Sequence, residues 1–361
     1  MTIERTVGTG VGADHENWLE AYNHVIAQGI LSENYDYVQV GNIVQPAGGW
    51  VAMATPNGRR IRFICPFADS NQGDPTRRFS TTIGAGVLGL IPRFPYPGGL
   101  TSGIFEMNGL KILCSNGSVA VSLADCYGFG NQIIELKNSI INGLGTINQR
   151  GVQGNNERSW NHISNIKIYN CPHLGYGSTG GGGGGGDPYP ASMVNVIENM
   201  VVYNCGVGIY AERLWDRFTV FRNVVSCGCP TDWMLIAGAT PNAPEYQTTY
   251  NCADSDGTLL IGSNQIHNIV PADEFKSLDD TNSKFLFLND GSFNVGGIAV
   301  PERGRAPLKV QFTDQTEYSW PEGVLASGGT EPTLTDTDIE GLDVPSPEGI
   351  YSIGCHQAQI I

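Results

Sequence analysis

Charged residues and long apolar runs are both scarce in this sequence. Charged residues make up 15% of the 361 residues, only six of them are lysines, and the formal net charge is −15. A surface this acidic repels nucleic acid phosphates and anionic lipid, so we expect no nucleic-acid partner. No run of about 18 apolar residues occurs either, so we expect no membrane insertion.

The sequence also lacks the marks of a secreted, disulfide-stapled protein. Its start, MTIERTVGTG, has neither the basic segment nor the apolar core of a secretion signal. Nine cysteines, an odd number without such a signal, argue against a disulfide framework and favour buried free thiols. We therefore expect synthesis in a cytoplasm.

Cofactor and metal motifs are missing as well. The glycine-rich segments are not followed by the Gly-Lys-Ser/Thr that a phosphate-binding loop needs, and we expect no cofactor. Asp336, Asp338 and Glu340 match the first half of a calcium loop, but Pro347 stands where the bidentate glutamate should be. A surface turn explains this segment better, so we expect no metal site.

Glycine is abundant, and the chain repeats itself. A seven-residue pattern of Asn, apolar, any, apolar, Tyr, Asn and Cys occurs at 165–171 and again at 199–205, and related segments begin at residues 109, 138 and 223. Periods of about 20 to 50 residues with one short strand per unit indicate a solenoid. The pattern predicts an all-β parallel β-helix in which asparagines at turns and apolar residues at inward positions form ladders.

Seven consecutive glycines, 180–186, lie between the two copies of this pattern. The unit that contains them exceeds its neighbours by about the length of the run. We interpret the run and its flanks, 176–190, as a loop expelled from one rung of the solenoid, neither a linker nor a domain boundary.

The N-terminal segment predicts a short helix that caps the solenoid. Trp18, Leu19, Tyr22, Val25 and Ile26 have helical spacing, and Asp14 is the expected N-cap. The predicted organisation is therefore an N-terminal strand and capping helix at 1–48, a parallel β-helix of about nine rungs at 49–290, and an irregular C-terminal cap or interaction segment at 291–361.

Both ends of the chain resemble a known protein family. The segments that carry the resemblance at the start are Arg5 to Gly10, the WLEAY helix and residues 34–38. Towards the end, they are residues 273–275, 285–288, 335–341 and 351–355. These segments are similar to right-handed parallel β-helix (pectin-lyase-like) virion proteins of tailed bacteriophages. The resemblance implies architecture and says little about chemistry.

The same resemblance raises the question of polysaccharide cleavage. Asp187, Arg213 and Asp216 lie near the glycine loop and are the candidate catalytic residues, because glycoside hydrolysis needs two carboxylates and lyase chemistry needs a base with cations. A solvated loop that pairs its own charges is the alternative interpretation. Nearby aromatics could stack on sugars or pack in the core: Tyr176, Tyr189, Trp215 and Trp233.

These observations favour a structural or adsorption protein of a bacteriophage particle, either a head-surface decoration or a tail-associated spike. The expected partners are other virion proteins, host surface polysaccharide and two further copies of the chain in a homotrimer, and the expected location is the virion. The alternative, from a different class, is a polysaccharide lyase or glycoside hydrolase that acts on bacterial surface glycans.

Overall fold

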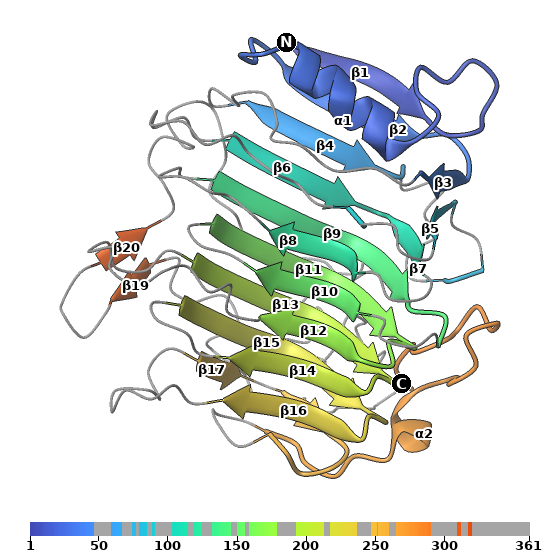
Figure 1. The fold of residues 1–361 in the computed structure, drawn as a ribbon. Helices are drawn as coiled ribbons and strands as arrows, with labels where there is room; N and C mark the ends of the chain where they lie inside the picture. The colour runs from blue at the N-terminus through green and yellow to red at the C-terminus, as the bar shows by residue number, and fades with distance from the viewer. Residues whose placement is uncertain are drawn as a thin grey trace, which may run out of the picture.

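The protein folds as a stack of parallel β-strands, seen side-on in Figure 1. The computed structural model describes residues 1–46, 59–66, 74–76, 79–84, 89–90, 103–114, 119–124, 132–145, 150–155, 159–178, 193–212, 217–236, 247–250, 252–259, 265–289, 309–311 and 317–319. No helix within these ranges is long and apolar enough to cross a membrane.

A large sheet forms one side of the stack, and its neighbouring strands pair in parallel. Its strand order is β1 (Thr2–Val7), β2 (Asn34–Gln39), β4 (Arg60–Ile64), β6 (Gly103–Asn108), β9 (Gln132–Asn142), β11 (Ser159–Tyr169), β13 (Met193–Tyr203), β15 (Arg217–Cys227) and β17 (Gln247–Tyr250). Four short strands pair beside this path, namely β3 (Ile43–Gln45), β5 (Ser80–Ile83), β7 (Lys111–Cys114) and β18 (Ala253–Asp254).

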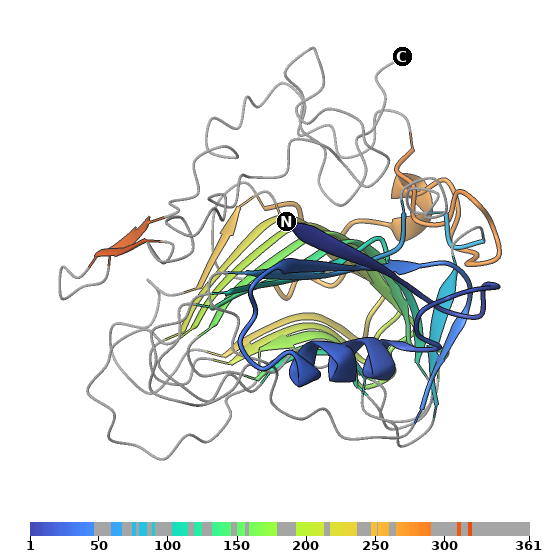
Figure 2. The ribbon, with the colours of Figure 1, turned by 90° about the horizontal axis from the view of Figure 1, so that it is seen from above.

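A smaller parallel sheet faces the large one across the core, as the view from above shows (Figure 2). It consists of β8 (Val119–Ala124), β10 (Arg150–Asn155), β12 (Leu174–Ser178), β14 (Val207–Glu212) and β16 (Thr231–Ile236). Alternate residues of both sheets point inward and form one apolar core, which includes Ile163 and Ile197 from the large sheet and Val152 and Ile209 from the small one. The all-β parallel β-helix predicted from the repeats is therefore confirmed.

Asparagine ladders run along the stack where the repeat placed them. In β9, β11, β13 and β15 the strand bends at an asparagine with positive φ: Asn138, Asn165, Asn199 and Asn223. Each of these side-chain amides donates to the asparagine side chain of the preceding rung, at 3.0–3.1 Å, and Asn108 is the first acceptor. Asparagine suits this bend because it tolerates the left-handed region and can hydrogen-bond along the stack.

The repeat units occupy equivalent positions on neighbouring rungs. Ile166 pairs with Met200, and Tyr169 with Tyr203, in the β11–β13 register. A second amide contact joins Asn204 to Asn170 at 2.7 Å. The glycine run falls between β12 and β13, two strands of the same solenoid, so it does not separate domains; the run itself lies outside the described residues.

The stack starts well before residue 49. β1 and β2 pair in parallel with each other and β2 pairs with β4, so the N-terminal segment belongs to the large sheet and is not a separate cap. The asparagine repeat begins only further along the chain, which is why sequence patterns did not include these strands in the solenoid.

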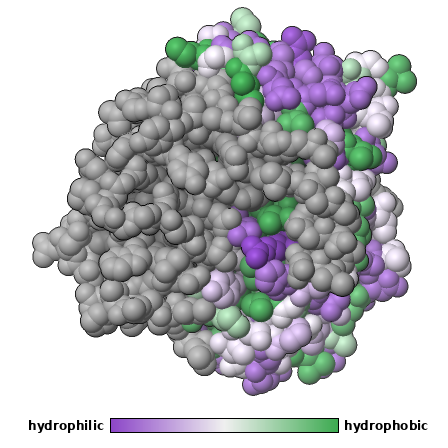
Figure 3. Space-filling model, viewed as in Figure 1, coloured by the Kyte–Doolittle hydropathy of each residue, from purple (hydrophilic) through white to green (hydrophobic). Residues whose placement is uncertain are grey.

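A helix closes this end, as predicted, but its N-cap is not Asp14. Helix α1 (Trp18–Ala27) begins after Asn17, whose Oδ1 accepts the Glu20 backbone N–H at 3.0 Å, while Asn17 Nδ2 donates to Glu20 Oε1. Asp14 instead accepts from the backbone and hydroxyl of Thr6 and so ties the preceding loop to β1. The surface of this end combines hydrophilic and hydrophobic residues on the face that Figure 3 shows.

A further segment covers the outside of the stack towards its far end. Residues 265–289, which contain α2 (Pro271–Glu274), begin with a single parallel bridge from Ile266 to Ala253 and then lie along the outside of the stack, and we call them the C-terminal strap. Apolar strap residues such as Phe275 and Phe285 cover the outward side chains of Ile140, Val201 and Val225. Beyond the strap, the described residues form only the antiparallel pair β19 (Lys309–Gln311) and β20 (Glu317–Ser319).

Candidate functional site

Most of the site residues predicted from sequence cannot be placed. Asp187, Arg213 and Asp216, together with Tyr189 and Trp215, lie outside the described residues. Their proposed roles therefore remain predictions.

Tyr176 and Trp233 lie in the core and not on a sugar-binding surface. Both rings are at most 2% exposed, and both pack edge-on against Phe221, with ring centroids 5.9 and 5.3 Å away. Trp233 Nε1 also donates to the Ala253 carbonyl at 3.1 Å. The packing alternative applies to these two residues, because in β12 and β16 they occupy inward positions.

The outer face of the large sheet carries a row of ionisable side chains that sequence reasoning missed. Strand register aligns Asp36, Arg62, Glu106, Glu135 and His162 on five successive strands. Their neighbours along each strand point into the core, so these side chains point outward. We call these five residues the outer charged row.

All of this row except the half-buried Arg62 is buried, even though the row faces away from the core. Glu106, Glu135 and His162 are each at most 4% exposed, and Glu198 on the next strand is fully buried. Burial of a charge is costly unless the charge is paired, so the contacts within the row decide what it can do.

The charged groups of the row are paired with one another or with adjacent side chains. Arg62 forms a two-pronged contact with Asp36, and Arg60 lies 3.7 Å from Glu106, which also accepts from Asn108 at 3.0 Å. In the next rungs, Lys137 Nζ lies 3.0 Å from Glu135. The charges thus largely offset each other along the sheet.

A histidine–glutamate pair ends the row. His162 Nε2 lies 2.9 Å from Glu198 Oε1, while His162 Nδ1 is buried and has no hydrogen-bond partner among the described residues. A carboxylate that fixes one imidazole nitrogen is part of the arrangement in which histidine can act as a base, although here the other nitrogen, Nδ1, is shielded from solvent. Among the groups on this face, the pair is therefore the one whose arrangement most resembles a catalytic base.

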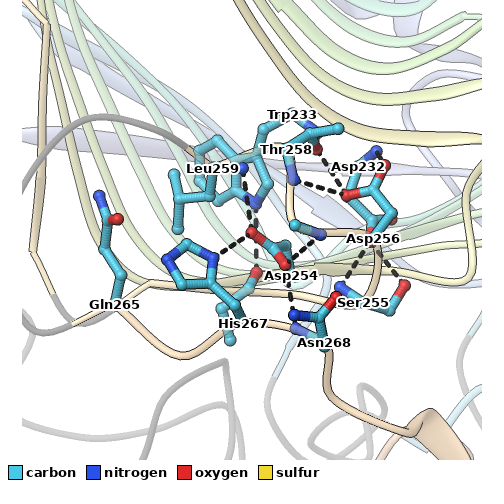
Figure 4. Close-up of polar contacts among 12 residues, drawn as sticks. Asp232, Trp233, Asp254, Ser255, Asp256, Thr258, Leu259, Gln265, His267 and Asn268 are labelled. Carbon is cyan, nitrogen blue, oxygen red and sulfur yellow. Dashed lines mark hydrogen bonds and ion pairs between the residues drawn. The ribbon is translucent and has the colours of Figure 1, made fainter.

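A second polar cluster lies at the last rung, and it serves the fold. Asp254 accepts from the backbone of Gly257, Leu259 and Asn268 and from His267, and its side chain is fully buried (Figure 4). Asp232 accepts from Cys229 and twice from Ser255, and burial raises its pKa. Because these carboxylates are used to hold turns of successive rungs, we assign them a structural role.

Stacked cysteines are the remaining candidates for metal binding. Cys171 and Cys205 occupy the same place in successive rungs, as the repeat predicts, and the Cys205 backbone N–H donates to Cys229 Sγ at 3.3 Å. Burial raises the pKa of the Cys205 thiol well above its usual value, so it stays protonated. Within the described ranges, no three histidine, cysteine or acidic side chains converge as metal ligands.

Comparison with known proteins identifies no family for this chain. No family model matches the chain, and no curated protein does. Among solved structures, one described as the crystal structure of pectate lyase Pel9A is similar, with a TM-score of 0.38 and 10% identity over 80% of this chain and 89% of that one. A likeness at this level carries no argument about chemistry, and the activity in that name belongs to that protein.

Proposed function

We propose that the protein is a structural or adsorption protein of a bacteriophage particle, a head-surface decoration or a tail-associated spike, that acts by binding and by its shape. Support for the phage setting comes from the sequence resemblance of the two ends of the chain. Support for a non-catalytic role comes from the structure of the outer face.

The observation that carries this proposal is the pairing of the buried outer charges. A catalytic acid or base is tuned by an environment that leaves one charge poorly compensated, whereas Asp36, Glu106 and Glu135 each have a cationic partner nearby. The pairs of Asp36 and Glu106 join neighbouring strands, whereas that of Glu135 lies within β9. A rigid stack laced by amide ladders and ion pairs serves as a stiff platform from which loops can meet a partner.

The proposed partners follow from this role. We infer contacts with other virion proteins and with host surface polysaccharide, assembly as a homotrimer, and synthesis in the host cytoplasm before incorporation into the particle. The net charge of −15 favours partners with basic or neutral surfaces.

Quantitative mass spectrometry of purified particles tests the proposal. Stoichiometric presence is expected, with hundreds of copies for a head decoration and a few for a tail spike. If antibodies against the recombinant protein label no particle and the peptides are absent from purified virions, the proposal fails.

A second candidate function, cleavage of bacterial surface glycans, is favoured by one observation. Glu106 and Glu135 are direct neighbours on adjacent strands, which places their backbones about 4.8 Å apart, and His162 follows in the same row. Retaining glycosidases hold two carboxyl groups about 5–5.5 Å apart. Register therefore brings two acidic side chains to neighbouring positions on this face, and two carboxyl groups are what that chemistry requires.

Incubation with capsule or lipopolysaccharide distinguishes the two functions. New reducing ends, or the ultraviolet absorbance of unsaturated sugars, would support cleavage if Glu106→Gln and Glu135→Gln abolished them while the exposed Glu16→Gln control did not. Asp216→Asn tests the site predicted from sequence in the same assay. Absence of product, together with presence in particles, favours the virion role.

A further inference from the structure

Helix α1 closes the N-terminal end of the core. Trp18, Ala21, Tyr22 and Val25 are all fully buried, and the Trp18 ring stacks on Phe63 of β4 with centroids 4.5 Å apart. Trp18 Nε1 also donates to Thr81 of β5 at 2.9 Å. From above, the helix lies across the end of the stack beside β1 and β2, so it covers apolar side chains that an open end would leave in water (Figure 2).

Two histidines lie at the seam between this helix and the first strands. His15 precedes the helix and bridges to Val7 of β1; His24 belongs to the helix, and the two ring centroids are 5.2 Å apart. His24 Nδ1 lies 2.7 Å from the hydroxyl of Tyr37, a fully buried residue of β2. His15 Nε2 is buried and makes no hydrogen bond within the described part of the chain.

The contact with Tyr37 depends on the charge of His24. Burial raises the pKa of Tyr37, so its hydroxyl keeps its proton and can either donate to a neutral His24 Nδ1 or accept from it, depending on the tautomer of the ring. Protonation of His24 fixes Nδ1 as a donor, so the hydroxyl can then only accept. A protonated His15 would place a further charge on a ring whose buried Nε2 has no acceptor among the described residues.

Burial outweighs the charged groups around the two rings, so both histidines favour their neutral forms. Burial is the largest cause that lowers the pKa of both histidines from the ordinary 6.5. For His24, the charges of His15 and Arg5 lower the pKa further and Asp14 opposes them; for His15, Asp14 and Glu20 raise it and Arg5 lowers it. Tyr35 and Tyr37 of β2 and Gln28 of the helix complete the surroundings without a charge.

We propose that α1 is an acid-sensitive plug of the β-helix, and that His15 and His24 together act as its sensor. Since both histidines are harder to protonate in the docked state, docking is favoured above about pH 6.5 and this contribution is lost as the pH falls below that value. For each histidine, the equilibrium constant for undocking can rise by up to about tenfold for each pH unit of acidification. Undocking exposes the Trp18 and Phe63 faces at the end of the core.

Hydrogen exchange of the whole protein between about pH 7.5 and about pH 5.5, corrected for the intrinsic pH dependence of exchange, tests this plug. We expect amides of α1 (Trp18–Ala27) to lose protection, by up to about tenfold for each histidine per pH unit, while those of β11 (Ser159–Tyr169) change little. In a His15→Phe/His24→Gln double variant the loss should disappear. The glutamine that replaces His24 still offers the Tyr37 hydroxyl an acceptor, and neither replacement side chain titrates.

His173→Gln is the matched control, since burial also lowers the pKa of His173, which lies far along the stack beside Arg150. This variant should keep the wild-type response of α1. The proposal is overturned if the double variant loses α1 protection as strongly as the wild type, or if β11 loses protection in parallel with α1 in the wild type. Should the double variant fold poorly, the single variant His24→Gln, which keeps the ring of His15, should show about half of the response on a logarithmic scale.

Discussion

The two faces of the large sheet are made by the same strands but are buried in different ways. Along β11 the inward residues Ile163, Ile166 and Ile168 join the apolar core, while the outward His162 lies in a buried charged row and the outward Lys167 lies under the C-terminal strap. The inner face needs only apolar volume, whereas the outer face needs a specific partner for each polar group. Burial by itself therefore does not tell which face of a strand is the core.

A charge placed on the inner face should destabilise the fold the most. Ile168 is fully buried and is flanked in register by Ile141 and Val202, so Ile168→Asp should cost several kcal/mol or abolish folding. Ile168→Val, the matched control, should cost only about 0.5–1.5 kcal/mol. Chemical denaturation measures both, and equal midpoints would show that the inner face tolerates charge as the outer face does.

Loss of one asparagine at the bend between the two halves of a strand should come next. Asn199→Ala removes two ladder hydrogen bonds and places alanine at φ 51°, a backbone conformation that asparagine tolerates better. The expected loss in the free energy of unfolding is about 2–4 kcal/mol. Asn199→Gly keeps the backbone conformation and should recover part of that loss. The comparison of the two unfolding free energies separates hydrogen bonding from backbone strain; if alanine proved as stable as asparagine, the ladder would contribute nothing.

Removal of a partner on the outer face should cost less than either change. Glu198→Ala leaves His162 Nε2 buried without its acceptor, with an expected cost of about 1–3 kcal/mol. Glu198→Gln retains an oxygen that can accept from a neutral His162 and should cost less. Thermal unfolding midpoints of the two variants check this order. If Glu198→Ala proved more stable than the wild type, the buried pair would be destabilising the fold.

The smallest effect is expected from the glycine run. Shortening Gly180 to Gly186 to two residues should leave stability nearly unchanged, because loop closure depends weakly on length and glycines bury no side chains. Thermal unfolding compares the midpoint of this loop variant with the midpoints of the wild type and of Ile168→Asp. A large loss of stability would show that the run packs into the stack and is not an expelled loop.

Much of the stack could be predicted from the sequence because its information is local and periodic. The repeated asparagines predicted the ladder, and alternation within each unit predicted that Ile166 and Met200 would stack. The functional candidates were predicted less well. Tyr176 and Trp233 are core residues. Sequence reasoning also did not single out the buried ionisable residues of the outer face, namely Glu106, Glu135, His162 and Glu198. Single acidic residues spaced one rung apart give no motif until strand register aligns them.

The sequence by itself determined the parallel β-helix, because each rung repeats a local pattern of inward apolar residues and turn asparagines that only stacking can satisfy. Tertiary structure decided where the stack begins, which asparagine caps α1, and which outward side chains are covered. Lys167 shows the reason: it is fully buried, and its ammonium donates at 2.5 Å to the carbonyl of Phe285, a residue 118 positions away. A contact between such distant segments leaves no periodic trace in either of them.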